Sequence, residues 1–353
     1  MSASWPVVIL GGTGYVAGEM ARLVTGHPNL VLAASASTSQ AGQRLAASFP
    51  HLAPAVADQR FVALDDALGI IASAPHTVLL SAAPHGESAE VIGRALDQAA
   101  DAGVKLTVVD ASADFRFADP EAFAAVYGKP HPRPELLAQF TCAVPEHHAQ
   151  LTSAHAAQPG CFATSMLLGI VPLTAAGIAE PKFQVSAVTG STGAGRTPRD
   201  TTHHPERQSN LFAYQPLAHR HQPEVEALAQ AAVGVVVDVS FVPHSGPFAR
   251  GIHATIFARL TRRATSDDVN AALADFYGDS PLVHVDAALP RVKDVAGSCH
   301  AALSARVDGD TVVVCAVLDN LLKGAAGGCL QWVNRILGLP ETTGIAAPAP
   351  GWI

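Results

Sequence analysis

The chain has 353 residues, of which 49% are hydrophobic and 15% charged, and its formal net charge is −8. This length predicts two domains, each with its own core. No apolar run approaches the roughly 18 residues that span a bilayer, and an acidic chain without blocks of Lys and Arg is a poor partner for nucleic acid. The N-terminal sequence MSASWPVVIL lacks a basic leader region, so we expect a cytoplasmic protein with neither a membrane nor a nucleic-acid partner.

The first part of the chain alternates short apolar strands with amphipathic helices. VVIL, LVLAASAS, TVLLSAA and KLTVVDAS predict strands at residues 7–10, 30–37, 77–83 and 105–112. GEMARLVTG and ESAEVIGRALDQAADAG have the periodicity of helices. Nearly continuous apolar strands that alternate with helices indicate a parallel sheet covered on both faces. We therefore predict an α/β fold whose first domain is doubly wound.

A glycine-rich turn follows the first predicted strand. GGTGYVAGEM contains the pattern G-x-G-x-x-A at Gly12, Gly14 and Ala17, between a strand and the start of a helix. Glycines at these positions let a pyrophosphate approach backbone N–H groups, and a small third residue lets the helix pack closely on the strand. The alternative is a turn without a ligand. The strand and helix on either side favour dinucleotide binding.

The second predicted strand ends without the acidic residue that usually holds the ribose 2′-hydroxyl of NAD. Ser35, Ser37 and Thr38 offer hydroxyls there instead, and Arg44 is the nearest arginine. Hydroxyls without a carboxylate suit a 2′-phosphate, which favours NADP. The predicted cofactor-binding residues are Gly11, Gly12, Thr13, Gly14, Tyr15, Val16, Ser35, Ser37 and Thr38.

Cys161 stands out among five scattered cysteines. The five, at positions 142, 161, 299, 315 and 329, show no CxxC spacing, which argues against a disulfide framework and a thiolate zinc site. Cys161 follows Pro159 and Gly160 and precedes a predicted helix start. A helix N-terminus lowers the pKa of a thiol through its dipole and its unpaired N–H groups. Cys161 is therefore a candidate nucleophile.

Beyond Cys161 the predicted strands become longer and the helices fewer. Several strands alternate apolar and polar residues, as in a mixed or antiparallel sheet with one wetter face. This pattern predicts a second, α+β domain, and the closing segment is helical after Gly324. The strands are expected at residues 183–191, 235–243, 251–260, 298–307 and 311–319.

Histidines supply the second kind of reactive side chain. In LAHRHQPEVE, His219 and His221 are both candidate acid–base partners for a cysteine, and Glu224 and Glu226 are candidates to orient them. A packing or surface role for each histidine is the alternative. The tract HHPER at residues 203–207 raises a metal site, but its spacing matches no standard zinc pattern, so we expect no metal.

Two arginines lie in loops where α/β sheets bind ligands. Arg116 follows a predicted strand in DASADFR, and Arg196 lies in TGSTGAGR. A planar guanidinium suits bidentate capture of phosphate or carboxylate. A solvated surface position is the alternative for each.

Several blocks, in order along the chain, together resemble one enzyme family. They are GGTGYVAGEMARLVTGHPNL, SADFR with AVYGKPHPRPELL, QPGCFATS, STGAGR with THHPE and HRHQPEVE, PHSGPFARGIHATI, and LDNLLKGAAGGCLQWVNRILGLPETTG. This set is similar to N-acetyl-gamma-glutamyl-phosphate reductase, the NADP-dependent enzyme of arginine biosynthesis. Two departures, QPGC for the commoner NPGC and STGAGR for a longer Ser-Gly block, leave the thiol and the arginine in place.

The resemblance implies roles and domain boundaries. It implies that Cys161 is the nucleophile, that His219 is the acid–base residue and that Glu224 supports it, with His221 less favoured. It implies a Rossmann-type NADP-binding domain over residues 1–158, joined by a C-terminal helix at 323–353, and an α+β catalytic and dimerisation domain over 159–322. Family members form homodimers or homotetramers. The expected substrate-binding residues are Arg116, Arg196, Ser112 and His221.

The implied reaction matches these residues. A thiolate at Cys161 attacks a small acyl phosphate, phosphate leaves, and NADPH reduces the resulting thioester to N-acetyl-glutamate 5-semialdehyde. The nearest alternative is a relative in lysine biosynthesis that reduces an aminoadipyl phosphate on a carrier protein, for which this acidic chain offers no obvious basic rim. Aspartate-semialdehyde dehydrogenase fits HRHQPEVE and KGAAGG less well. A nucleotide-sensing protein without catalysis would be expected to lack the cysteine or the histidine, and both are present.

Overall fold

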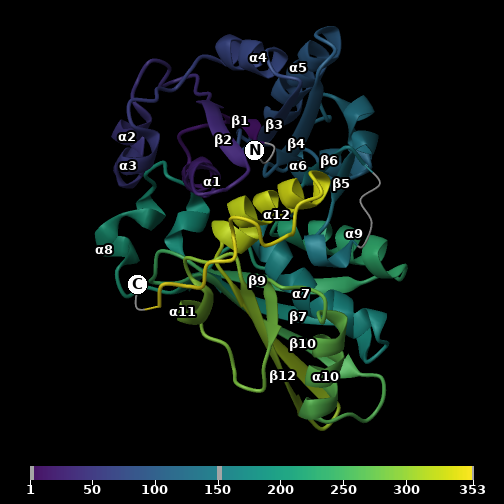
Figure 1. The fold of residues 1–353 in the computed structure, drawn as a ribbon. Helices are drawn as coiled ribbons and strands as arrows, with labels where there is room; N and C mark the ends of the chain where they lie inside the picture. Colours follow the sequence, from purple (N-terminus) through teal and green to yellow (C-terminus); the bar gives the residue numbers. More distant parts are fainter. Residues whose placement is uncertain (1–3, 149–152, 352–353) are drawn as a thin grey trace. The chain divides into compact units, whose positions relative to one another are not determined.

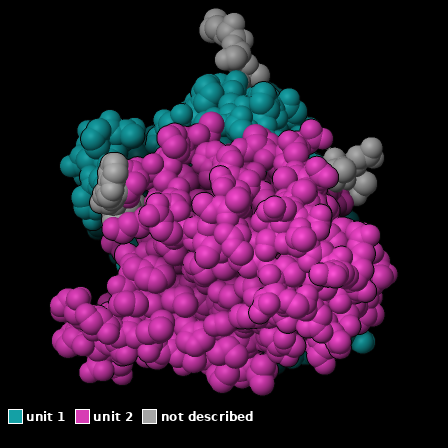
Figure 2. All heavy atoms as spheres, turned by 90° about the horizontal axis from the view of Figure 1, so that it is seen from below, with its two compact units in different colours: residues 1–142, 150–158, 326–345 teal, residues 143–149, 159–325, 346–353 magenta. Residues whose placement is uncertain are grey.

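The computed structural model describes residues 4–148 and 153–351, and its chain divides into two compact units (Figures 1 and 2). Unit 1 comprises residues 1–142, 150–158 and 326–345. Unit 2 comprises residues 143–149, 159–325 and 346–353. None of the described helices is long and apolar enough to cross a membrane.

Unit 1 is built around a six-stranded, fully parallel sheet with the order β2-β1-β3-β4-β6-β5. Helices α1 and α12 pack on one face, and α4 and α5 pack on the other (Figure 1). The predicted doubly wound parallel sheet is therefore confirmed. The helices and strands are β1 (Trp5–Leu10), α1 (Tyr15–Thr25), β2 (Leu30–Ser35), α2 (Leu45–Ser48), α3 (Ala53–Val56), α4 (Leu64–Ala72), β3 (His76–Ser81), α5 (Ser88–Asp101), β4 (Lys105–Asp110), α6 (Pro120–Tyr127), β5 (Phe140–Cys142), β6 (His155–Ala157) and α12 (Gly327–Ile336).

The core of unit 1 explains why the apolar runs are nearly continuous. Along β1, alternate residues face opposite sides of the sheet, and Val7 and Val8 are both fully buried because helices cover both faces. Strands β5 and β6 have three residues each. Such short strands show no periodicity that sequence reasoning could detect, and they were not predicted.

Unit 2 contains a mixed seven-stranded sheet with the order β11-β12-β13-β10-β7-β9-β8. Pairs β7/β9 and β11/β12 are parallel, and the other pairs are antiparallel. The predicted α+β character is confirmed. The helices and strands are α7 (Cys161–Ala175), β7 (Ala179–Thr189), α8 (His204–Arg207), β8 (Phe212–Ala213), α9 (His221–Val233), β9 (Asp238–Ser245), β10 (Ile252–Leu260), α10 (Ser266–Phe276), β11 (Val283–Val285), α11 (Val292–Val295), β12 (Ala301–Asp308), β13 (Thr311–Leu318) and the π-helical turn Leu322–Ala326.

One face of the unit 2 sheet is covered by α7, α9 and α10. Helix α7 is buried along nearly its whole length, from Phe162 to Leu173, and forms the centre of this core. Strand β10 alternates between the two faces, so that Ile256 is buried under α7 whereas Phe257 is 39% exposed on the other face. The sheet therefore supports α7, the helix that begins with Cys161.

Candidate active site

Cys161 is the first residue of α7, and Gly160 caps that helix with extended backbone angles. The first amide groups of a helix have no acceptor within the helix, and its dipole places positive potential at this end. The thiol of Cys161 is partly exposed. The chain therefore places a partly exposed cysteine at a position that favours the thiolate.

Helix α9 begins with His221, whose ring lies against the residue before the cysteine. A Cβ atom built on Gly160 would lie 2.2 Å from His221 Nε2, so only glycine at this position lets the imidazole come so close to the main chain. One turn later, the fully buried carboxylate of Glu224 accepts a hydrogen bond of 2.6 Å from the Gly160 amide. The first turn of α9 therefore positions the backbone that carries Cys161.

His219 lies in a more apolar environment than His221. Its ring packs edge-on against Phe162, Tyr214 and Phe241. Its Nδ1 atom accepts the backbone N–H of His221 at 3.2 Å. Burial and, to a smaller extent, the nearby charge of Arg220 together lower the pKa of His219 to about 4. His219 is therefore a neutral imidazole near neutral pH that helps to hold the start of α9.

Tyr214 is a residue of this site that sequence reasoning missed. Its ring centroid lies 5.7 Å from that of His219. Burial raises the pKa of the Tyr214 phenol, and the negative charge of the Cys161 thiolate raises it further. The phenol therefore stays protonated and lies within electrostatic reach of the sulfur. The only sequence signal is an aromatic residue five positions before His219, which is too weak to single it out.

A cavity of about 400 Å³ lies at the C-terminal edge of the unit 1 sheet. It brings together five predicted cofactor-binding residues, and Ser39, Pro84 and Glu87 also line it. The predicted residues Gly12, Tyr15, Val16 and Ser35 do not line it. The five lining residues from the prediction are Gly11, Thr13, Gly14, Ser37 and Thr38.

The glycine-rich turn at this cavity fits a dinucleotide phosphate. Gly11 has φ +72°, and a Cβ atom there would lie 2.4 Å from Ala82 O, so the tight turn requires glycine. A Cβ atom on Gly14 would meet nothing within 4 Å, which leaves its backbone open to a ligand. Gly14 also precedes α1, whose N-terminal amides suit an anion. These features match the pyrophosphate site expected at this turn.

The ribose end of the cavity carries hydroxyls and no basic side chain among its described lining residues. Ser37 Oγ accepts a hydrogen bond from the Gln40 amide, and Thr38 is exposed. The guanidinium of Arg44 pairs with Asp58 at 2.9 Å. The groups available to a ribose at this end of the cavity are therefore hydroxyls.

Arg116 and Ser112 lie in unit 1, just after β4. Arg116 is buried, and its guanidinium donates to the carbonyls of Ala111 and Gln158. The Ser112 hydroxyl donates to Asp110. Burial raises the pKa of Asp110 to about 6, although hydrogen bonds from Ser112 and Ser88 oppose the shift. These contacts give the loop after β4 a defined shape.

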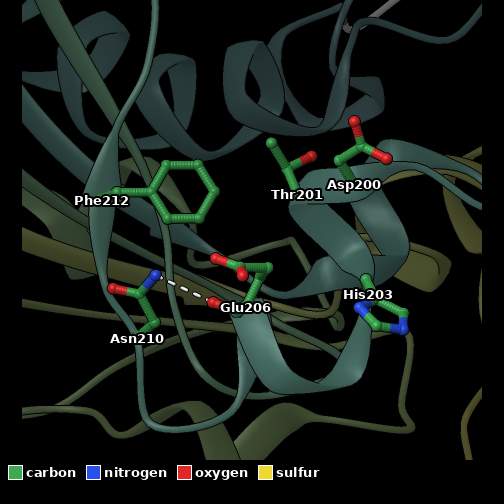
Figure 3. A pocket seen from close by; sticks show the side chains of 6 residues that line it. All are labelled: Asp200, Thr201, His203, Glu206, Asn210 and Phe212. Carbon is green, nitrogen blue, oxygen red and sulfur yellow. Dashed lines mark hydrogen bonds between the residues drawn. The ribbon is translucent and has the colours of Figure 1, made fainter.

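Arg196 lies in unit 2, exposed in the loop that follows β7. The histidine tract lies farther along, and a cavity of about 470 Å³ there is lined by Asp200, His203, Glu206 and three further residues (Figure 3). No group of three or more His, Cys, Asp or Glu side chains within residues 4–148 and 153–351 is arranged to hold a metal ion. The structure therefore offers no observation in favour of the metal hypothesis raised by HHPER.

Comparison with known proteins shows the class of enzyme to which the chain belongs. The family model described as the NAD binding domain of semialdehyde dehydrogenase matches residues 6–152, and the model described as its dimerisation domain matches residues 161–320. The fold is similar to that of aspartate semialdehyde dehydrogenase II from Vibrio cholerae, with a TM-score of 0.68 at 17% identity over 96% of this chain and 99% of that chain. A probable aspartate-semialdehyde dehydrogenase from Pseudomonas aeruginosa gives 0.66 at 18% identity, over 95% and 98% of the two chains. Fold, site and family models define an oxidoreductase of the semialdehyde dehydrogenase class that uses a nicotinamide dinucleotide.

Relatives with higher sequence identity identify one family within this class. N-acetyl-gamma-glutamyl-phosphate reductase from Rhodopirellula baltica is 38% identical over 352 residues, which cover 98% of this chain and 99% of that protein. The protein of that name from Pseudomonas aeruginosa is 37% identical, over 97% and 98% of the two chains. The chain belongs to the N-acetyl-gamma-glutamyl-phosphate reductase family.

Proposed function

We propose that the protein reduces N-acetyl-gamma-glutamyl phosphate with NADPH to N-acetyl-glutamate 5-semialdehyde and phosphate, as a step of arginine biosynthesis. The observation that carries the proposal is the position of Cys161 at the start of α7, next to Gly160, against which the imidazole of His221 lies. It stands in a chain whose full-length relatives bear the name of this reaction.

Cys161 is the nucleophile in this proposal. Its thiolate attacks the acyl carbon of the substrate, the C–O bond to phosphate breaks, and phosphate leaves with the bonding electrons, which gives a thioester on Sγ. The tetrahedral oxyanion forms at the N-terminus of α7, where amide groups without helical acceptors are available. One such donor is commonly worth roughly 3 kcal/mol in the transition state.

His221 is the acid–base residue in this proposal, in place of His219, which the sequence favoured. His221 Nε2 lies against Gly160, next to the nucleophile. An effective general base has a pKa near the operating pH, and the pKa of His219 is only about 4. His221 takes the thiol proton before attack. After the thioester carbonyl is reduced, the tetrahedral species collapses, its C–S bond breaks to release the semialdehyde, and His221 returns the proton to the thiolate. Glu224 supports the site by holding the Gly160 amide.

The cavity at the glycine-rich turn holds NADP in this proposal. The backbone at Gly11 and Gly14 would hold the pyrophosphate, and the hydroxyls of Ser37 and Thr38 would hold the 2′-phosphate. When bound in reduced form, the cofactor supplies the hydride for the thioester carbonyl. The absence of a carboxylate at the end of β2 supports NADP over NAD.

Arg116, Arg196 and Ser112 remain the proposed substrate-binding residues of this reaction. Arg196 is exposed in its loop, where its guanidinium is accessible to an anion. Arg116 donates to the carbonyl of Ala111 after β4 and to that of Gln158 after β6, which fixes the orientation of its guanidinium. A free acyl phosphate is favoured over a carrier-bound aminoadipyl phosphate because the chain has a net charge of −8 and its relatives carry the name of the glutamyl enzyme.

The protein forms a homodimer or homotetramer in this proposal, through the unit 2 sheet. The face opposite α7 carries Val188, Phe257 and Val313, which are partly or fully exposed. A second copy of this chain is the expected occupant, since residues 161–320 match a dimerisation domain. Light scattering of the purified protein gives the number of copies, and a monomer at micromolar concentration would contradict this assignment.

The reaction is tested by following NADPH absorbance. Purified protein receives N-acetyl-glutamate 5-semialdehyde, phosphate and NADP, in parallel with a Cys161→Ala variant and with the aminoadipate semialdehyde analogue. We expect phosphate-dependent NADPH formation from the glutamate compound and none in the variant. Turnover of the longer analogue alone would assign the protein to the lysine pathway. Cofactor binding without turnover of either compound would indicate a nucleotide sensor.

A further inference from the structure

The π-helical turn Leu322–Ala326 lies directly against the nucleophile. A Cβ atom built on Gly324 would lie 2.8 Å from Cys161 Cβ and 3.1 Å from Cys161 Cα. Cys161 therefore occupies the side of Gly324 on which any other residue would carry its Cβ atom, and only glycine lets the turn lie so close. π-helical turns are rare and frequently lie at functional sites. Any displacement of the turn would move the cysteine or remove its support.

A buried carboxylate holds the N-terminal end of the turn. Asp319 is fully buried and accepts hydrogen bonds from the amides of Leu321 and Leu322 at 2.8 and 3.0 Å. The guanidinium of Arg250 binds both carboxylate oxygens of Asp319, at 2.9 and 3.1 Å. This end is therefore fixed by charge-assisted hydrogen bonds.

A second buried ion pair holds the middle of the turn. Lys323 Nζ lies 2.5 Å from Glu146 Oε1, and the two side chains are 1% and 0% exposed. Two charges removed from water lose several kcal/mol of solvation each, and an apolar pair of similar volume is often as stable. Stability alone is therefore a weak explanation for an ion pair at this place.

The position of Glu146 is fixed in turn by α7. His147, the next residue, hydrogen-bonds Tyr277 through Nε2 at 2.9 Å, and the Tyr277 hydroxyl donates to Leu168 O on α7 at 2.7 Å. The phenol has one proton, which goes to Leu168, so His147 is the donor. These contacts connect Leu168 on α7, through Tyr277 and the segment of Glu146 and His147, to Lys323 in the turn. The turn in turn contacts Cys161, at the start of the same helix.

We propose that Lys323 and Glu146 are positioning residues that fix Gly324 against Cys161 and thereby set the orientation of the nucleophile. This inference rests on the proposed role of Cys161. Neither side chain touches the reacting atoms in this account. The pair acts through the turn, because the ammonium and the carboxylate lock the residue next to Gly324 to a segment anchored on α7.

The test compares three variants with a surface control. Lys323→Met and Glu146→Gln each remove one charge of the buried pair, and a Lys323→Met/Glu146→Leu double variant removes both charges. Lys182→Met is the control, because Lys182 pairs with Asp238 at 3.3 Å with both side chains more than half exposed. The measurements are kcat, KM for NADPH, the thermal midpoint, and the pH profile of Cys161 alkylation by iodoacetamide, followed on the peptide that contains Cys161.

We expect each single variant to lower kcat roughly tenfold to a hundredfold, as for small misplacements of a reacting group. KM for NADPH stays unchanged and the alkylation profile of Cys161 shifts. The double variant unfolds at a temperature at least as high as the wild type, since apolar replacement of a buried pair is often neutral or stabilising, yet it remains slow. If the double variant had the kcat and the Cys161 alkylation profile of the wild type, the ion pair would contribute only to stability, and the inference would be overturned.

The alkylation profile separates this inference from the proposed function. If the wild type failed to turn over the acyl phosphate, the proposed function would be wrong, whereas a shifted Cys161 profile in the single variants would still support the positioning role. An unshifted profile in both single variants would refute the positioning role even in an active enzyme.

Discussion

At the scale of single residues, Cys161 depends on glycines far apart in the sequence. Gly160 leaves room for the imidazole of His221, and Gly324, in the π-helical turn, leaves room for Cys161 itself. A side chain at either position would meet neighbouring atoms closer than 3 Å. The position of the Cys161 thiol therefore depends on the absence of a side chain at Gly160 and at Gly324.

The two neighbouring histidines are expected to differ in their effect on catalysis. His221→Asn should lower kcat by about 10² to 10⁴-fold, the usual contribution of a general acid–base group. His219→Asn should have a much smaller effect, because the buried ring of His219 has a pKa of about 4 and contacts the backbone of His221. Steady-state kinetics of the two variants checks this, with NADP affinity as the control for folding. An equal or larger loss in His219→Asn would restore the assignment made from the sequence.

At the scale of elements, helix boundaries place the reactive groups. Helix α7 begins at Cys161 because Pro159 and Gly160 interrupt the preceding segment, and α9 begins at His221. Helix α9 was not predicted as a helix, because its buried side includes the polar residues His221 and Glu224 and the block HRHQPEVE was interpreted only as a motif. Helix α10 was also missed, although Thr265 and Asp268 form a capping box at its start.

The capping box of α10 allows a test of element stability away from the site. Thr265 Oγ1 accepts from the Asp268 amide, and the Asp268 carboxylate accepts from the Thr265 amide at 2.8 Å. Thr265→Ala should lower the free energy of unfolding by about 1 kcal/mol and leave kcat unchanged. Urea unfolding measures the first quantity. Asp267→Asn is the matched control in the same turn, and an equal loss there would show that charge, and not the capping bond, stabilises the helix.

At the scale of the whole molecule, buried histidines make stability depend on pH. Burial lowers the pKa of His147, His155 and His219 to about 4. Above pH 6.5 these groups are neutral in both the folded and the unfolded chain, so they do not lower the free energy of unfolding there. As the pH falls from 6.5 towards 4 the unfolded chain takes up protons first, and stability is lost. Asp110 has the opposite effect, since its raised pKa of about 6 lets the folded chain retain a proton that the unfolded chain has lost.

The groups with lowered and raised pKa are divided unevenly between the two units, and this division predicts which unit unfolds first in acid. His155 and Asp110 are both in unit 1 and largely offset one another, whereas His147 and His219 are both in unit 2. Unit 2 should therefore unfold first as the pH falls from 7 to 4.5. Limited proteolysis with mapping of the first cut sites checks this, and first cuts in unit 1 would contradict it.

Local pattern alone determined several features of this protein. The parallel sheet followed from apolar runs that alternate with helices, the mixed sheet from alternating strands, and the glycine-rich turn and the helix start at Cys161 from residues adjacent in the chain. These features depend on periods of a few residues, which a sequence displays directly. Sequence similarity to a family then supplied the reaction and the cofactor, which the family models and relatives support at the level of class and family.

Only the tertiary structure decided how the candidate site is assembled. The bond from Gly160 to Glu224 spans 64 residues, and the pair of Glu146 and Lys323 spans 177. Sequence spacing carries no information about such contacts, because chain folding brings together side chains whose separation follows no period. For the same reason, the choice of His221 over His219 required the packing of each ring, and the importance of Tyr214 and Gly324 emerged only from their contacts with Cys161 and its neighbours.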